Sequence, residues 1–335
     1  MTGPEQSVVA GRFQVLDGWR GVSILLVLAT HLLPLGPKEW RLNSTAGPMG
    51  MALFFTLSGF LITSFLLHHS SVLDFLIRRF FRILPLAWLG STIALLASHS
   101  SAPAYWAHYL FYANLPPMQL TIIGSHLWSL CVEMQFYVSV AMLFGVAGVR
   151  GLMWIPVFCL AVTAGRIVTG TPLSEVTYFR VDEILAGGIL ALVFEGRLGV
   201  GPRRFLGWVN PYIVMGLLLV SCHPATGFAN YLRPYFAATL VGATLLGSDS
   251  TLARSLRMGW LAYVAAISYA LYVNHQFLEF TWLGEGDRLV KYAKRPLLLA
   301  ASFALAHVST YYFEHRWIAM GKRLSSRWAM RARAA

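Results

Sequence analysis

Long apolar runs separated by short polar segments dominate the pattern of this chain. A hydrocarbon core requires about 20 mostly apolar residues per helix, and ten runs reach or approach that length. The pattern therefore predicts an all-α integral membrane protein, a bundle of about ten transmembrane helices. The predicted spans are residues 16–35, 50–68, 81–98, 127–149, 151–166, 182–196, 205–222, 235–248, 259–282 and 296–313. The fifth, sixth and eighth runs are short, so nine spans is the alternative.

The distribution of basic residues predicts how these spans are oriented. Most of the 26 Lys and Arg residues lie in segments that would be cytoplasmic if both termini were cytoplasmic, and such an excess marks the inner side of a membrane. The first run contains Asp17 and Arg20 and lacks a cleavage pattern of small residues, so we expect a retained span rather than a signal peptide. No repeat is visible, and the tail after residue 313 is short. We therefore expect one membrane domain over residues 1–335 without an appended soluble domain.

The composition supports a bilayer environment and excludes two other classes. The chain is 57% hydrophobic and 12% charged, with a mean hydropathy of +0.60, whereas soluble domains have about 25% charged residues. The net charge of +12 is spread between apolar runs, which is unlike a nucleic-acid-binding face. Cys131, Cys159 and Cys222 lie in or beside apolar runs without metal-ligand spacing. We expect no metal site, no disulfide framework and no nucleic-acid partner.

Ionisable residues inside the predicted spans are the first functional signal. Such a residue costs about 3 kcal/mol at a helix centre and usually faces the interior of the bundle. Arg20 and His31 are 11 residues apart in the first span, so both project from one helix face, about 16 Å apart along the axis. Two side chains that extend toward opposite membrane surfaces would explain the same spacing.

Two further stretches place charged residues at helical spacing. Arg79 and Arg82 in FLIRRFFRILP stand at i and i+3 beside Arg78, and a guanidinium group suits bidentate phosphate binding. From the spacing alone, an ordinary cluster of cytoplasmic basic residues is the favoured explanation. Glu133 in HLWSLCVEMQFY has Ser129 and Tyr137 one turn away on either side. The cost of burying a carboxylate favours a functional role for Glu133 over a simple interhelical hydrogen bond.

Later polar groups have structural explanations that compete with functional ones. YFRVDEILAGG brings three charged residues to the start of the sixth span, where an ion pair would account for them. ISYALYVNHQF aligns three polar residues on one face with an asparagine beside it, and interhelical hydrogen bonds would explain these. The residues concerned are Arg180, Asp182, Glu183, Ser268, Tyr272, Asn274 and His275. Glu314 and His315 are expected at the inner boundary of the membrane.

The order of these motifs resembles acyltransferase family 3, a group of integral-membrane proteins that includes O-antigen and peptidoglycan O-acetyltransferases. LDGWRGVSILLVLATH resembles the opening helix of the family, with its arginine and histidine, and LFFTLSGFLITSFL its F-F-x-L-S-G-F segment. The remaining four similarities are RRFFRILP to an R-x-x-R pair, HLWSLCVEMQFY to W-S-L-x-x-E-x-Q-F-Y, FRVDEILAGGILA to R-x-D-x-x-L-x-G, and ISYALYVNH to I-S-Y-x-L-Y-x-x-H. Six motifs in the right order cover nearly the whole chain.

The chain departs from the family pattern at three places. Ala52 stands where an acidic residue often precedes L-F-F, and Met134 replaces the second residue of a Glu-Glu pair. YYFEHRW lacks the proline that commonly follows the last glutamate of the family, so the resemblance gives less weight to Glu314. None of these departures affects the histidine, the arginine pair or Glu133.

The resemblance implies a ten-helix enzyme of the cell membrane that transfers an acyl group, acetyl above all, from acyl-CoA to a hydroxyl group. By the resemblance, Arg79, Arg82 and Arg78 bind the donor phosphates, and the pantetheine arm passes Arg20 toward His31. His31 is then a general base or a nucleophile that carries the acyl group, and Glu133 orients its imidazole. Supporting or acceptor-binding roles are expected for Arg180, Asp182, Ser268, Tyr272, Asn274, His275 and Asp17. Asp17 is expected above all to pair with a neighbouring arginine.

Several alternatives stay open at this stage. The acceptor is a cell-surface or lipid-linked carbohydrate or, alternatively, a small molecule such as a macrolide or glycolipid. A multi-span transporter would also place polar groups through a bundle, although no paired Gly/Pro-interrupted spans suggest inverted repeats. A purely structural membrane protein would leave the cost of the buried charges unexplained.

Overall fold

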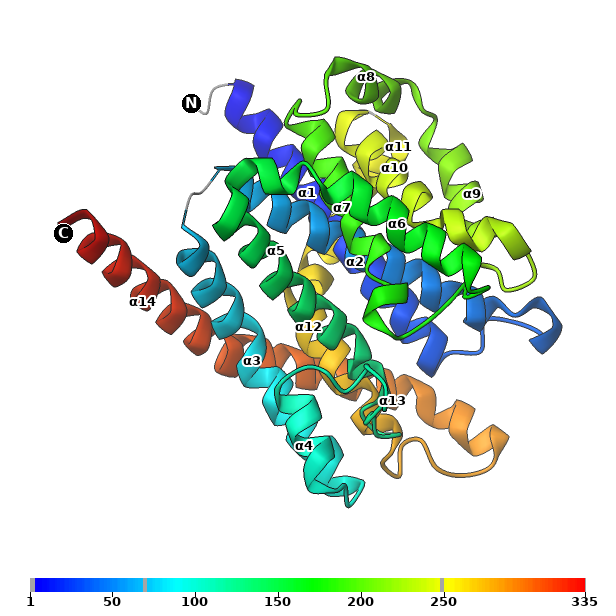
Figure 1. Cartoon of the computed structure of the whole chain (residues 1–335). Coiled ribbons are helices and arrows are strands. Elements are labelled where there is room, and N and C mark those ends of the chain that lie inside the picture. The colour runs from blue at the N-terminus through cyan, green and yellow to red at the C-terminus, as the bar shows by residue number, and fades with distance from the viewer. Residues whose placement is uncertain (1–3, 69–70, 248–249, 335) are drawn as a thin grey trace. The chain divides into compact units, whose positions relative to one another are not determined.

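The computed structural model describes residues 4–68, 71–247 and 250–334, and all regular elements in these ranges are helical. The α-helices are α1 (Pro4–Leu32), α2 (Leu42–His68), α3 (Val72–Ala97), α4 (Ala102–Tyr109), α5 (Trp128–Leu152), α6 (Ile155–Val168), α7 (Asp182–Phe194), α8 (Val200–Trp208), α9 (Pro211–Cys222), α10 (Arg233–Leu246), α11 (Thr251–Leu256), α12 (Gly259–Glu279), α13 (Arg288–Val308) and α14 (His315–Ala334). The short helices are η1 (Lys38–Trp40), η2 (Ser125–Leu127), η3 (Thr177–Phe179), η4 (Gly227–Leu232) and the π-helix η5 (Ser309–Glu314). Figure 1 shows their order along the chain.

Five segments of the described chain are long and apolar enough to cross a membrane. They are Gln14–Leu32, Lys38–His68, Val72–Ala97, Ser125–Leu152 and Arg288–Trp328. A sixth is added if α8 and α9, which are bent by 92° at their junction, form one broken span. The expected all-α membrane protein is confirmed. Ten spans and cytoplasmic termini stay predictions.

Length and polarity explain why the other predicted spans fall outside this set. The helices α6, α7 and α10 have 14, 13 and 14 residues, which is short of the roughly 20 residues that a straight crossing requires. Helix α12 has 21 residues, but its second half carries Ser268, Asn274, His275 and Gln276, which lower its hydropathy. All four of these side chains are buried, so the second half of α12 carries a buried polar face.

The chain divides into two compact units. Unit 1 comprises residues 1–64, 153–174 and 181–268, and unit 2 comprises residues 65–152, 175–180 and 269–335. Each unit therefore combines segments that are far apart in the sequence, and each brings together its own set of candidate site residues.

Close helix contacts at glycine hold unit 1 together. A Cβ atom on Gly59 of α2 would lie 1.8 Å from the carbonyl oxygen of Ile184 in α7, and one on Gly187 would lie 2.0 Å from the carbonyl oxygen of Thr56. Two helices with small residues at their crossing can approach closely, as is common in membrane proteins. Trp19 of α1 is buried and donates a 2.8 Å hydrogen bond to Thr244 of α10. These contacts fix α1, α2, α7 and α10 around one hydrophobic core.

Unit 2 is built on α3, which contacts α4, α5 and α14. In Figure 1, α14 runs beside the first half of α3 along much of its length. Helix α5 is interrupted near its end by Gly148, whose φ of +57° lies in the left-handed region that favours glycine. The polar residues of α3, α5 and α12 that the sequence singled out lie in this unit, apart from Ser268, which belongs to unit 1.

Candidate active site

His31 lies in the last turn of α1, and Arg20 lies three turns earlier on the same helix. The Arg20 guanidinium is 3.7 Å from a carboxylate oxygen of Asp17, so the expected pairing of Asp17 with a neighbouring arginine is confirmed. Both side chains of this pair are partly exposed, as is that of His31. Arg20 and His31 belong to one continuous α-helix, in which 11 residues correspond to about 16 Å along the axis.

Asn43 of α2 caps the end of α1 beside His31. Its side-chain amide donates to the carbonyl oxygens of Ala29 (3.3 Å), Thr30 (2.9 Å) and Leu33 (2.6 Å). Its carbonyl oxygen accepts a 3.2 Å hydrogen bond from the backbone of Leu35. The last carbonyls of a helix have no intrahelical partner, so this cap fixes the turn that carries His31.

Arg78, Arg79 and Arg82 line a pocket of about 180 Å³ in unit 2, near the start of α3. The Arg79 guanidinium lies 5.9 Å from the centre of the Phe75 ring and 5.8 Å from that of Tyr137, within the range of cation–π attraction. Nε of Arg78 donates to Asp74 at 2.9 Å. The structure thus brings together the three arginines that the sequence assigned to one site.

Glu133 of α5 lies beside this arginine cluster. It is 5% exposed and accepts a hydrogen bond from the Tyr137 hydroxyl, one turn later. The Arg82 guanidinium interacts electrostatically with Glu133, with Tyr137 and with Glu314 of the π-helix η5. Glu133 and Tyr137 therefore share one face of α5, as predicted, and are joined by a hydrogen bond. Glu314 is a second carboxylate that interacts electrostatically with Arg82.

The structure gives Glu314 a buried position near the arginine cluster, which the sequence motif did not indicate. Its side chain is 6% exposed and accepts a 3.0 Å hydrogen bond from Thr310. Tyr269, one of the polar residues of α12, donates a 2.6 Å hydrogen bond to the carbonyl oxygen of Ile83, the residue after Arg82. The absence of a following proline lowered the weight of Glu314 in the motif comparison. The sequence motif does not show that Glu314 is buried and interacts with Arg82 of another helix.

A second polar cluster joins α5 to α12 on the N-terminal side of Glu133. The hydroxyl groups of Ser129 and Tyr272 are 2.5 Å apart, and the Tyr272 hydroxyl donates to the carbonyl oxygen of His126. One ring nitrogen of His126 is 2.8 Å from Oε1 of Gln276. Ser129, Glu133 and Tyr137 follow one another at spacings of four residues, so they form a polar face along α5. His126 precedes this face in the short helix η2.

His275 and Ser268 make local contacts along α12. Nδ1 of His275 is 2.7 Å from the carbonyl oxygen of Tyr272, and its ring centre is 4.9 Å from that of His126. Ser268 belongs to unit 1 and donates a 2.8 Å hydrogen bond to Ala265 in the preceding turn. Asn274 is buried. The structure therefore brings Tyr272 and His275 to the α5–α12 cluster, whereas the described contact of Ser268 is a helical one.

Arg180 and Asp182 belong to different units and have different partners. The Arg180 guanidinium lies 5.3 Å from the centre of the Trp128 ring in unit 2. Asp182 begins α7 in unit 1 and forms a fully buried ion pair with Arg166 of α6. The sequence suggested an ion pair near the start of this helix. The partner of Asp182 comes from the preceding helix.

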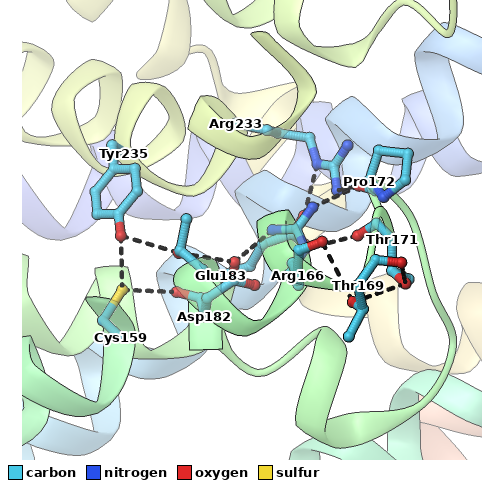
Figure 2. A network of polar contacts seen from close by, with 10 residues as sticks. Cys159, Arg166, Thr169, Thr171, Pro172, Asp182, Glu183, Arg233 and Tyr235 are labelled. Carbon is cyan, nitrogen blue, oxygen red and sulfur yellow. Dashed lines mark hydrogen bonds and ion pairs between the residues drawn. The ribbon is translucent and has the colours of Figure 1, made fainter. Parts of the chain in front are cut away.

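Figure 2 shows that this ion pair belongs to a larger buried network in unit 1. Glu183 accepts a 2.7 Å hydrogen bond from Nε of Arg233 in α10, and both side chains are at most 2% exposed. Asp182 also accepts from Thr163 at 3.2 Å. The two arginines converge on the carbonyl oxygen of Pro172, at 2.5 Å from Arg166 and 3.5 Å from Arg233.

Sequence reasoning missed the role of Arg166 and Arg233. In the sequence each is only a basic residue at the end of an apolar run. A buried charge is tolerated only where it is paired and hydrogen-bonded, and here the partners lie on different helices. The adjacent acids Asp182 and Glu183 in an apolar run were the available signal, since two buried carboxylates require two cations.

Within the residues that the structure describes, no group of three or more His, Cys, Asp or Glu side chains has a metal-binding arrangement. Cys131, Cys159 and Cys222 are buried free thiols. Cys159 approaches the Tyr235 hydroxyl at 3.8 Å in the network of Figure 2.

Two known proteins are similar to this chain over most of its length. The chain is 26% identical over 316 residues to the peptidoglycan O-acetyltransferase OatA of Listeria monocytogenes, covering 78% of this chain and 48% of that protein. It is 23% identical over 310 residues to nodulation protein 10 of Rhizobium leguminosarum, covering 82% and 84% of the two chains. The chain thus spans about half the length of the Listeria relative. No solved structure matches it.

The family comparison covers most of the chain. The sequence model of a family described as an acyltransferase domain matches residues 13–317. This range includes α1 with His31, the arginine cluster of α3, the polar face of α5 and the π-helix with Glu314. The chain therefore belongs to the acyltransferase family that its ordered motifs resemble.

Proposed function

We propose that this protein is a membrane O-acyltransferase that moves an acyl group from cytoplasmic acyl-CoA to a hydroxyl group of a cell-surface or lipid-linked carbohydrate. The observation that carries the proposal is the pocket lined by Arg78, Arg79 and Arg82 in a chain of the acyltransferase family. Coenzyme A carries a diphosphate and a further phosphate, and guanidinium groups bind such oxyanions through paired hydrogen bonds. The membrane in question is the cell membrane.

His31 supplies the proton transfer in this proposal. The hydroxyl oxygen of the acceptor attacks the thioester carbonyl carbon while the His31 imidazole takes the hydroxyl proton, a contribution of about 10²–10⁴-fold. The carbon–sulfur bond then breaks, and the imidazolium returns the proton to the leaving thiolate. The products are the ester and the free thiol of coenzyme A. In a second route the imidazole itself carries the acyl group between donor and acceptor.

Two further side chains support the transfer. Arg20 lies on the same helix face as His31 and guides the donor toward it. Glu133 orients the imidazole and stabilises its protonated form, as the acid of a catalytic triad does. His31 belongs to unit 1 and Glu133 to unit 2, so this pairing is part of the proposal.

The name of the Listeria relative supports both the acyl group and the acceptor class. That protein is a peptidoglycan O-acetyltransferase, and peptidoglycan is a carbohydrate polymer. We infer acetyl as the acyl group and a carbohydrate as the acceptor of this chain. A small molecule with a hydroxyl group is the alternative acceptor.

The test is mass spectrometry of glycans, lipids and small-molecule products from cells that express the wild type, His31→Ala or His315→Ala. His315 is an exposed histidine of α14, so it is the matched control. We expect a species one acetyl group heavier with the wild type and with His315→Ala, and its loss with His31→Ala. Thiol release from acetyl-CoA by the purified full chain should follow the same order.

Three outcomes would argue against the proposal. Acylated product in the His31→Ala strain would exclude His31 as base or nucleophile. An acylated small molecule with unmodified glycans would replace the carbohydrate acceptor. No thiol release from acetyl-CoA by inserted wild-type protein, together with solute flux into proteoliposomes, would favour the transporter alternative.

A further inference from the structure

The last helix, α14, lies against the half of α3 that carries the arginine cluster. Three contacts define its register: the ring of Trp317 against that of Phe81 at 6.4 Å, Gly321 against the same Phe81, and Ser325, which donates a hydrogen bond to Asp74. The three α14 residues are spaced by four, so they form one stripe along the helix. This stripe faces α3.

Gly321 is the point of closest approach between the two helices. A Cβ atom at this position would lie 2.6 Å from Cβ of Phe81, which is closer than van der Waals contact allows. The small residue lets the backbone of α14 approach α3. The side chains next to this stripe, Ile318 and Lys322, are thereby brought to the pocket of Arg78, Arg79 and Arg82.

The pocket therefore contains four cationic side chains from two helices. Arg78 is engaged by Asp74, which also accepts the hydrogen bond from Ser325. The Arg79 guanidinium lies over two aromatic rings, and Lys322 is exposed at the side formed by α14. Phe65, Phe75 and Ile318 complete the lining. Such a combination of cations around a small space suits an anion that carries more than one charge.

The size of the pocket indicates which part of a donor it holds. Its volume is about 180 Å³, whereas sites that enclose a whole drug-sized ligand have roughly 300–1,000 Å³. The pocket therefore fits a phosphate or diphosphate group, and the rest of the donor lies outside it.

We propose that α14 forms part of the donor site and that the ammonium group of Lys322 binds a phosphate of acyl-CoA together with Arg79 and Arg82. The inference rests on the proposed function, because it takes acyl-CoA as the donor. Lys322 lies beyond residues 13–317, the range that matches the family, so family motifs do not assign it a role. The chain extends the arginine site with a residue from its own last helix.

The experiment measures the affinity of the purified full chain for coenzyme A and for 3′-dephospho-coenzyme A by isothermal titration. Lys322→Ala should weaken coenzyme A binding by about tenfold or more, because a charge-assisted hydrogen bond is lost, while Lys322→Arg stays near the wild type. Steady-state kinetics should show a higher KM for the donor and an unchanged kcat. Equal weakening of both ligands assigns Lys322 to the diphosphate, and weakening of coenzyme A alone assigns it to the 3′-phosphate.

Arg323→Ala is the matched control, because Arg323 is an exposed cation on the same helix that does not line the pocket. It should bind coenzyme A as the wild type does. Wild-type affinity in Lys322→Ala, while replacing Arg79 and Arg82 abolishes binding, would overturn the role of Lys322 and leave the donor site intact. Wild-type affinity in all of these variants would overturn the donor site itself. Equal losses in Lys322→Ala and Arg323→Ala would indicate general attraction by the charge of α14.

Discussion

At the residue scale, the carboxylate of Glu133 is the side chain whose environment says most about its role. It is buried, it accepts a hydrogen bond from Tyr137, and it faces Arg82. The hydrogen bond from Tyr137 holds the carboxylate in one orientation. A carboxylate held in this way can stabilise a positive charge that develops during acyl transfer.

Replacing Glu133 by Gln should lower kcat for acyl transfer by about 10²-fold, since the amide keeps the size of the side chain and removes its charge. Tyr137→Phe should have a smaller effect of about tenfold, because it removes one hydrogen bond to the carboxylate. Ser139→Ala, at an exposed position of α5, is the control. Steady-state thiol release measures all three, and wild-type kcat in Glu133→Gln would exclude its part in the transfer.

The buried ion pair of Arg166 and Asp182 gives a prediction about stability. Arg166→Ala leaves the carboxylate of Asp182 without its main cation and should lower the free energy of unfolding by about 3–5 kcal/mol. The double variant Arg166→Met, Asp182→Leu should recover most of this loss, because no charge is then buried. Thermal unfolding in detergent measures the difference. Additive losses in the double variant would show that the two side chains do not stabilise each other.

The sequence identified the polar pairs that lie on one helix. Asp17 with Arg20 and Glu133 with Tyr137 follow from spacings of three and four residues, because the helix itself sets those distances. It did not identify Arg166 with Asp182 or Arg82 with Glu314, because tertiary packing sets the distance between side chains of different helices. Residue roles that depend on two helices required the structure.

At the scale of elements, close helix crossings decide which helices become neighbours. The crossing of α2 and α7 depends on Gly59 and Gly187, where added Cβ atoms would overlap backbone carbonyl oxygens. The motif FFTLSGFLITSFL therefore has a physical explanation at its glycine: the backbone of α7 occupies the place of a side chain. The sequence located both glycines without showing that they face each other.

Gly59→Ala should destabilise the protein by about 1–3 kcal/mol, because the helices must separate to admit the methyl group. Gly216→Ala in α9 is the matched control, since nothing lies within 4 Å of the added Cβ atom there. It should be neutral or stabilising by up to about 1 kcal/mol from helix propensity. Thermal unfolding in detergent compares the two, and equal melting temperatures would mean that the α2–α7 crossing relaxes without cost.

Apolar length also has limits as a predictor of elements. The runs at residues 151–166, 182–196 and 235–248 form helices of 13 or 14 residues. Helix α7 is nonetheless almost wholly buried, because its apolar residues face other helices. Hydropathy reports how apolar a segment is, and it does not distinguish helices that face lipid from helices that face protein.

At the scale of the whole molecule, the basic residues give the prediction that both termini are cytoplasmic. Reporter proteins fused to the N-terminus and to the C-terminus should both be active only in the cytoplasm. A cysteine introduced at Lys38, between the predicted spans 16–35 and 50–68, should react with an impermeant thiol reagent added outside the cell. Reporters on opposite sides of the membrane would indicate an odd number of spans. Either the arginine pocket or His31 would then lie at the opposite side of the membrane from the predicted one.

The π-helix η5 joins α13 to α14 without a break. Its hydrogen bonds link residues i and i+5 in place of i and i+4, so the segment behaves as a local insertion in a continuous helix. Each residue of an α-helix turns the chain by about 100°. Deleting one residue of Ser309–Glu314 should therefore return the segment to α-helical spacing and keep Lys322 beside α3. Deleting one residue between His315 and Gly321, within the α-helix, should instead rotate Lys322 away from α3. The π-helix accommodates the extra residue and therefore determines which face of α14 lies against α3.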